Sequence, residues 1–352
     1  MKSAVYILFL VMLLLAPCAY AEGEGYIEGE TQYNQNVKDI VSGNFRLDPA
    51  ELLNKGIDML TKEVSQSRII IINIMVIAAI SGILNVLQSS FGKNGSADAA
   101  FFACFTLTAI AVSRLVAEAV GYGAEVVGEL TDFITKICPV ITILLVSSGS
   151  AASAGSFYPI LSASVYAVSA VIDKCIIPLV YLSAILGIVN NLSTRVQLVN
   201  LNNLIKSFSK WILTAVLTVF TGITAIYGFS VPVLDAVSLK ALKFTVGSCV
   251  PVVGGLMADT VETVLSGAKL MKNAVGTAGI ISVVAICLVP VIKLAAIILM
   301  LRLAAAAAEP LCDKRISSMI SDIISPVTTV FSMVIASAML FIISIAIIMG
   351  AT

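Results

Sequence analysis

Five polar residues in the C-terminal half of the chain recur at the spacing of one helix face. They are Asp259, Glu262, Ser266, Lys269 and Asn273. Intervals of three and four residues bring successive side chains onto one side of an α-helix. In apolar surroundings such side chains are costly unless they meet water, a partner or each other. The stripe therefore predicts a surface that lines a polar pathway or faces a partner, or else an amphipathic helix at the membrane interface.

A second pair of charges, Arg114 and Glu118, lies four residues apart within an apolar run. Residues at this spacing are neighbours on a helix and can neutralise each other. Mutual neutralisation is the least costly way to carry either charge into a bilayer. We therefore expect an intramembrane ion pair with a structural role.

The side chains that most enzymes need are scarce in this chain. It contains no histidine, which removes the usual general base and the commonest zinc ligand. None of the seven cysteines forms a CxxC pair, and no GxSxG or GxGD motif is present. We expect no catalytic residues, no metal and no cofactor, and a protein that is not an enzyme.

Composition places these residues in a membrane. Hydrophobic residues make up 59% of the 352-residue chain and charged residues only 12%, so an all-α polytopic membrane protein is expected. Lys+Arg and Asp+Glu balance at 21 each, which gives no field to recruit nucleic acid. Six apolar runs are long enough to cross the bilayer: 69–88, 99–120, 175–192, 211–231, 279–301 and 324–349.

Two further apolar stretches, 134–172 and 244–275, are interrupted by proline, glycine and serine. We interpret them as broken or re-entrant elements, or as two crossings each, which would give eight spans. The candidate helix breaks are Pro139, Gly149, Gly155, Pro251, Gly254 and Gly255.

The N-terminus has the pattern of a signal peptide, at 1–21, with an Ala-Tyr-Ala cleavage site. Cleavage would leave an acidic extracytoplasmic arm at 22–68, whose apolar residues recur at helical spacing. Most loop charges then follow the positive-inside rule, with basic residues in the cytoplasm and acidic ones outside, although Lys240 and Lys243 would lie outside. Arg195, Lys206, Lys210, Arg302, Lys314 and Arg315 are on the predicted cytoplasmic side, and Glu125, Glu129 and Asp132 on the outer side.

The second part of the chain resembles a tandem duplication. Pro139 recurs as Pro251, and the segment from Cys175 to Pro178 recurs as Cys287 to Pro290, both at an offset of 112. The predicted organisation is a transmembrane helix pair at 69–120, a first membrane repeat at 131–231 and a second at 243–350. Whether the repeats are parallel or inverted depends on how often each broken element crosses.

Several segments resemble the stage III sporulation protein AE family of endospore-forming bacteria. They are Lys243 to Gly247, Pro251 to Gly254, Asp259 to Leu265, Lys272 to Gly276, and Cys138 to Gly155. The resemblance implies a mother-cell membrane protein of the channel complex that joins mother cell and forespore and supports late forespore gene expression. It also implies that other membrane proteins of that complex are its partners.

Two other functions fit the same residues. A duplicated membrane architecture also suits an autonomous secondary transporter for a small solute, although no dedicated substrate site is visible. The acidic arm would suit a membrane scaffold that recruits partners. Homo-oligomerisation is left open by the sequence.

Overall fold

The protein was analysed as a computed structural model that describes residues 76, 80, 95–192, 198–249, 254–310 and 312–350. Within these residues every regular element is helical and no strand occurs. The predicted signal peptide and arm lie outside the described residues, as does the run at 69–88 apart from Val76 and Ile80.

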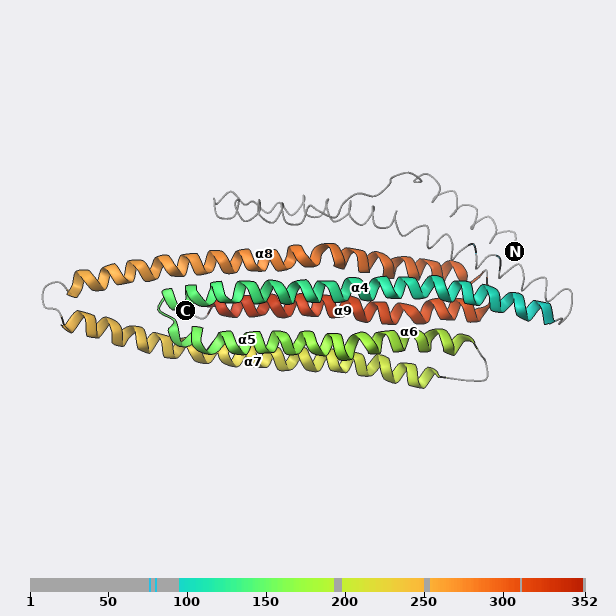
Figure 1. Cartoon of the computed structure of the whole chain (residues 1–352), viewed down its shortest axis with the longest axis horizontal. Coiled ribbons are helices and arrows are strands. Elements are labelled where there is room, and N and C mark those ends of the chain that lie inside the picture. Colours follow the sequence, from blue (N-terminus) through green and yellow to red (C-terminus); the bar gives the residue numbers. More distant parts are fainter. Residues whose placement is uncertain are drawn as a thin grey trace, which may run out of the picture.

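Long helices run side by side along one axis (Figure 1). In chain order they are α4 (Gly95–Ser147), α5 (Ala151–Val171), the π-helical segment η2 (Ile172–Ile176), α6 (Ile177–Leu192), α7 (Val199–Cys249), α8 (Gly254–Ala308) and α9 (Lys314–Gly350). α5, η2 and α6 follow one another as a single rod. α9 packs against α4, α6, α7 and α8, so the last helix of the chain lies at the centre of the bundle.

The helices are much longer than a bilayer is thick. α4, α7 and α8 contain 53, 51 and 55 residues, which corresponds to about 77–83 Å each, against about 30 Å of hydrocarbon. Five helical stretches of the described chain are long and apolar enough to cross a membrane. They are Phe101–Ser147, Tyr158–Leu192, Val199–Ile226, Thr263–Ala308 and Lys314–Ile347. The expected all-α membrane fold is confirmed.

The stretch 134–172 is a broken element, as one of the sequence interpretations predicted, and its two parts belong to helices long enough to cross a membrane. This stretch is the end of α4, a tight turn and the whole of α5, so it joins two long antiparallel helices. Gly149 has a φ of 84°, and the Ser150 N–H bonds the Leu145 carbonyl while the Gly149 N–H bonds that of Val146. This is the Schellman arrangement, in which a glycine without a Cβ ends the helix.

Two other predicted breaks do not end a helix. Pro139 lies inside α4 and Gly155 inside α5. A proline within a helix costs about 3 kcal/mol because one backbone hydrogen bond is lost. Around Pro139 that cost is offset by packing, since Ile134, Cys138 and Ile141 are all buried in the core. Burial of a whole helix face therefore outweighs one local helix breaker.

The second interrupted stretch, 244–275, is also part of long helices. α7 continues to Cys249 and α8 begins at Gly254, so Gly254 opens a helix and Gly255 lies within it. Pro251 lies outside the described residues. The described chain thus has long helices where the sequence predicted short spans separated by broken elements.

The duplication stays a prediction, although matched residues occupy related places. The segment from Cys175 to Pro178 lies where η2 joins α6, and its counterpart, Cys287 to Pro290, lies within α8. The rod of α5, η2 and α6 is followed by a connection and the long helix α7, and α8 is followed by a connection and the long helix α9. The π-helical turn is a difference between them, because α8 is α-helical throughout.

Candidate functional site: polar groups in an apolar bundle

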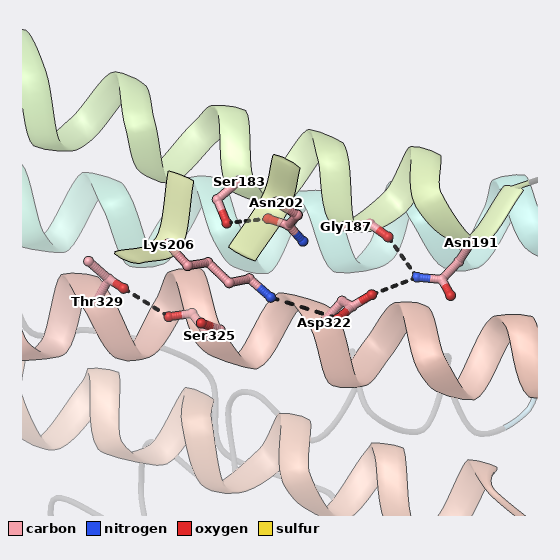
Figure 2. Close-up of polar contacts among 8 residues, drawn as sticks. All are labelled: Ser183, Gly187, Asn191, Asn202, Lys206, Asp322, Ser325 and Thr329. Carbon is pink, nitrogen blue, oxygen red and sulfur yellow. Dashed lines mark hydrogen bonds and ion pairs between the residues drawn. The ribbon is translucent and has the colours of Figure 1, made fainter. Parts of the chain in front are cut away.

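A group of polar side chains joins α6, α7 and α9 (Figure 2). The Asp322 carboxylate of α9 accepts a hydrogen bond of 2.8 Å from the Asn191 amide of α6. The Lys206 ammonium of α7 lies 3.7 Å from the other Asp322 oxygen. Nearby, the Ser183 hydroxyl donates to the Asn202 side-chain oxygen at 2.9 Å. Three helices are therefore linked by directional bonds in an otherwise apolar interface.

Close approach of the backbones makes these bonds possible. Gly187 of α6 sits against α9, where an added Cβ would lie 3.2 Å from the Cβ of Asp322 and 3.8 Å from the Asn202 amide nitrogen. The same glycine carbonyl accepts a second hydrogen bond from Asn191, at 2.8 Å. Small residues let membrane helices approach and polar residues then bond across them. We call Ser183, Asn191, Asn202, Lys206 and Asp322 the α6–α7–α9 cluster.

The sequence analysis missed this cluster. Lys206 was interpreted only as a cytoplasmic charge that sets orientation, and Asp322 was not singled out at all. The available signal was that Asp322 is the last charged residue of the chain and is followed by a long apolar stretch. Its partner Asn191 is 131 positions away, so the pairing depends on the tertiary fold.

The predicted ion pair on α4 does not form. Arg114 and Glu118 are both exposed on the surface of α4, and no ion pair joins them. Arg114 instead lines an open groove of about 520 Å³ between α4 and α6, together with Ser113, Phe105 and Ile188. The two side chains belong to a longer series of charges on the same helix face.

All six charged residues between Phe101 and Ser147 lie on one exposed face of α4. They are Arg114, Glu118, Glu125, Glu129, Asp132 and Lys136, at intervals of 4, 7, 4, 3 and 4. At 100° per residue these positions fall within an arc of about 60°. We call this face the α4 stripe. From its first to its last charge it extends about 33 Å along the helix.

The α4 stripe runs beside the most apolar parts of the bundle. Gly123 contacts Val330 of α9, the Lys293 ammonium lies 4.7 Å from the Tyr122 ring centre, and Ile137 packs near Gly279 of α8. These contacts place 123–137 of α4 level with 279–293 of α8 and 330–345 of α9. No charged residue occurs in 273–292 or 323–352, so these stretches mark the depth of the hydrocarbon.

This depth corrects one part of the predicted topology. Glu125, Glu129 and Asp132 were expected outside the membrane, but they lie level with its most apolar helices. Facing them and Lys136 to lipid would cost about 2.5 kcal/mol each, or about 10 kcal/mol together. That is comparable with the whole stability of a protein domain. The α4 stripe must therefore meet water or protein.

The stripe first singled out in the sequence lies along α8 and is called the α8 stripe: Asp259, Glu262, Ser266, Lys269 and Asn273. Its neighbour Lys272 fixes its place beside the C-terminal end of α9. Lys272 is almost completely buried, at 1% exposure, and its ammonium donates a 3.0 Å hydrogen bond to the Met349 carbonyl in the last turn of α9. Gly276 provides the space for the Met349 side chain. Lysine at a helix C-terminus satisfies a free carbonyl and the helix dipole.

The stripe residues from Asp259 to Lys269 lie beyond that contact. Residues 254–271 continue past the end of α9 by about 27 Å, and α7 extends in the same direction (Figure 1). We call these projecting ends of α7 and α8 the α7–α8 arm. Ser266 and Asn273 are exposed and Lys269 is half-buried, while Asp259 and Glu262 lie in the α8 part of the arm.

Replacing Lys272 by methionine is expected to loosen the end of α9. The hydrogen bond from a charged donor contributes about 1.5 kcal/mol, so amide exchange in the last turn of α9 should accelerate about tenfold. Lys269→Met, which removes a neighbouring charge without a bond to α9, is the matched control. Hydrogen exchange by mass spectrometry measures both, and equal rates in the two variants would contradict the assignment.

No group of three metal-ligating side chains occurs among the residues that the structure describes. The polar groups found there are hydroxyls, amides and charges that bond to each other or face outward. Their arrangement suits the linking of helices and the wetting of a helix face.

Long apolar helices with internal polar bonds and one charged face define the class of this chain, a multi-pass α-helical membrane protein. The family model for stage III sporulation protein AE matches residues 31–352, and the chain belongs to that family. The "Stage III sporulation protein AE" of Bacillus subtilis (strain 168) is 28% identical over 316 residues, which cover 90% of this chain and 79% of the relative. No solved structure matches this chain. The resemblance stated from the sequence is confirmed.

Proposed function

We propose that this chain is a multi-pass component of the channel or secretion complex that connects mother cell and forespore, and that it supports late forespore development. It would act in the mother-cell membrane around the forespore as a non-enzymatic part of an assembly. The family match over residues 31–352 carries this proposal. The family name specifies a stage of sporulation, and membership of the complex is proposed in addition.

The α7–α8 arm supports a role between two membranes. The opposite end of the bundle carries Lys206, Lys210, Arg302, Lys314 and Arg315, which the positive-inside rule places in the cytoplasm. The arm then projects out of the mother cell toward the forespore membrane. A projection of about 27 Å past the end of α9 gives partner proteins in that gap a surface to bind.

Under this proposal the polar residues of the α8 stripe contact partners of the complex. The triple variant Asp259→Asn, Glu262→Gln, Lys269→Gln removes the three charges and keeps similar side-chain size. We expect the amount of chain in the membrane to be unchanged, co-purification of the other membrane proteins of the complex to fall at least tenfold, and a late forespore reporter to fall with it.

Glu309→Gln is the matched control, because Glu309 is an exposed charge in the connection at the other end of the bundle. It should leave both readouts at the level of the unmodified chain. Full co-purification and full reporter activity in the triple variant would overturn the proposal that the α7–α8 arm binds partner proteins. An autonomous transporter would tolerate the triple variant but would give solute uptake in vesicles that contain this chain alone.

A further inference from the structure

Neither the α7–α8 arm nor the packing of the bundle explains why the exposed face of α4 is charged. The α4 stripe carries both signs of charge, and each of its six charged side chains points away from the described core. It is level with charge-free stretches of α8 and α9, as the contacts of Gly123 and Ile137 show. A face of this kind has to be wetted or covered.

Two features favour water over a tightly packed partner. Glu125, Glu129 and Asp132 follow one another on successive turns, and like charges at this spacing repel unless solvent screens them. Gly121 and Gly128 lie on the same face, and a Cβ added at either position would have nothing within 4 Å. Among the residues that the structure describes, nothing covers this charged face at these two positions.

We propose that the α4 stripe forms one wall of a water-filled passage through the membrane. That the passage serves the complex between mother cell and forespore rests on the proposed function. That the α4 stripe is wetted follows from the residues of this chain alone. Arg114 marks the predicted cytoplasmic end of the wall and Lys136 the other end, with the carboxylates between them. Polar or hydrated cargo could move along such a wall, whereas lipid could not cover it.

Aqueous access to the glycine positions tests the wall directly. Single cysteines are placed at Gly121 or Gly128 in the full chain with its native cysteines replaced, because the open space there accepts a side chain. Open membrane fragments from sporulating cells, in which a reagent reaches both faces, are treated with a membrane-impermeant maleimide. Both positions should react within tenfold of the rate of a cysteine at the exposed Glu309.

Val284→Cys is the lipid-facing control. Val284 is 49% exposed on α8 and lies in the charge-free stretch at the same depth, so it should react at least a hundredfold more slowly. Rates at Gly121 and Gly128 as low as at Val284 would overturn the proposal, whether lipid or a partner protein covers the face.

A second variant distinguishes a passage that cargo uses from a water-filled crevice that does not cross the membrane. Gly128→Trp fills the open face without a clash inside the bundle, and Val284→Trp adds the same bulk on the lipid-facing side. With both chains at normal membrane levels, the late forespore reporter should fall at least tenfold only in Gly128→Trp. An unchanged reporter would overturn the passage. A fall in the reporter together with loss of co-purification would mean that the face binds a partner, and it would also overturn the passage.

Discussion

Gly123→Ala is expected to destabilise the bundle, whereas the same substitution at Gly121 or Gly128 is not. An added Cβ at Gly123 would overlap Cγ1 of Val330 and lie 3.0 Å from the terminal methyl of Met333. Val330 is β-branched and almost fully buried at 1% exposure, so it cannot rotate away easily. Overpacking of this kind costs about 2 kcal/mol.

The two control glycines isolate that effect. Each has open space around the position of a Cβ, so alanine there should stabilise the helix by about 0.5–1 kcal/mol through its higher helix propensity. Melting temperatures of the three variants in detergent give the comparison. A Gly123→Ala protein that melts with the Gly121→Ala protein would show that α4 and α9 are not packed as described.

Asp322→Ala should give the second large effect. It leaves the Asn191 amide and the Lys206 ammonium of the α6–α7–α9 cluster without their shared acceptor. A hydrogen bond to a charged group contributes about 1.5–3 kcal/mol, and partial exposure of the Asp322 side chain, 32%, puts the expected loss near the lower end. Thermal unfolding in detergent measures it, with Glu118→Ala as a control that removes an exposed carboxylate.

A double-mutant cycle with Lys206→Met divides the effect between the two partners. The ammonium is 3.7 Å from the carboxylate, so its coupling to Asp322 should stay below about 1 kcal/mol, and most of the loss should remain when Lys206 is absent. A coupling that accounts for the whole loss would mean that the salt bridge, rather than Asn191, holds α9 in place.

The location of the membrane helices was predictable because hydropathy reports long apolar runs directly. The runs at 99–120, 211–231, 279–301 and 324–349 each fall inside one described helix, respectively α4, α7, α8 and α9. The ends of those helices were not predictable in the same way. A helix such as α4 continues past Pro139 because its buried face is worth more than the bond that proline removes, and that gain depends on residues elsewhere in the chain.

The polar sites also divide into those that the sequence predicts and those that depend on the tertiary fold. The α8 stripe was visible because its members are close in sequence and share one helical face. The regular spacing of the α4 charges was also present in the sequence, but its meaning depends on the depth set by Val330 and Gly279 on other helices. The α6–α7–α9 cluster could not be predicted from spacing, because Asn191 and Asp322 meet only when three helices assemble.

The central place of α9 has a consequence for biogenesis. Ribosomes deliver this helix after α4, α6, α7 and α8, yet all four pack against it. The earlier helices contact one another, as α4 does with α5 and α8, but they lack their shared partner until α9 leaves the translocon and inserts among them. A chain that stops before Lys314 would lose the helix that joins the others, and quality-control proteases would meet an incompletely packed set of helices rather than a slightly shortened protein.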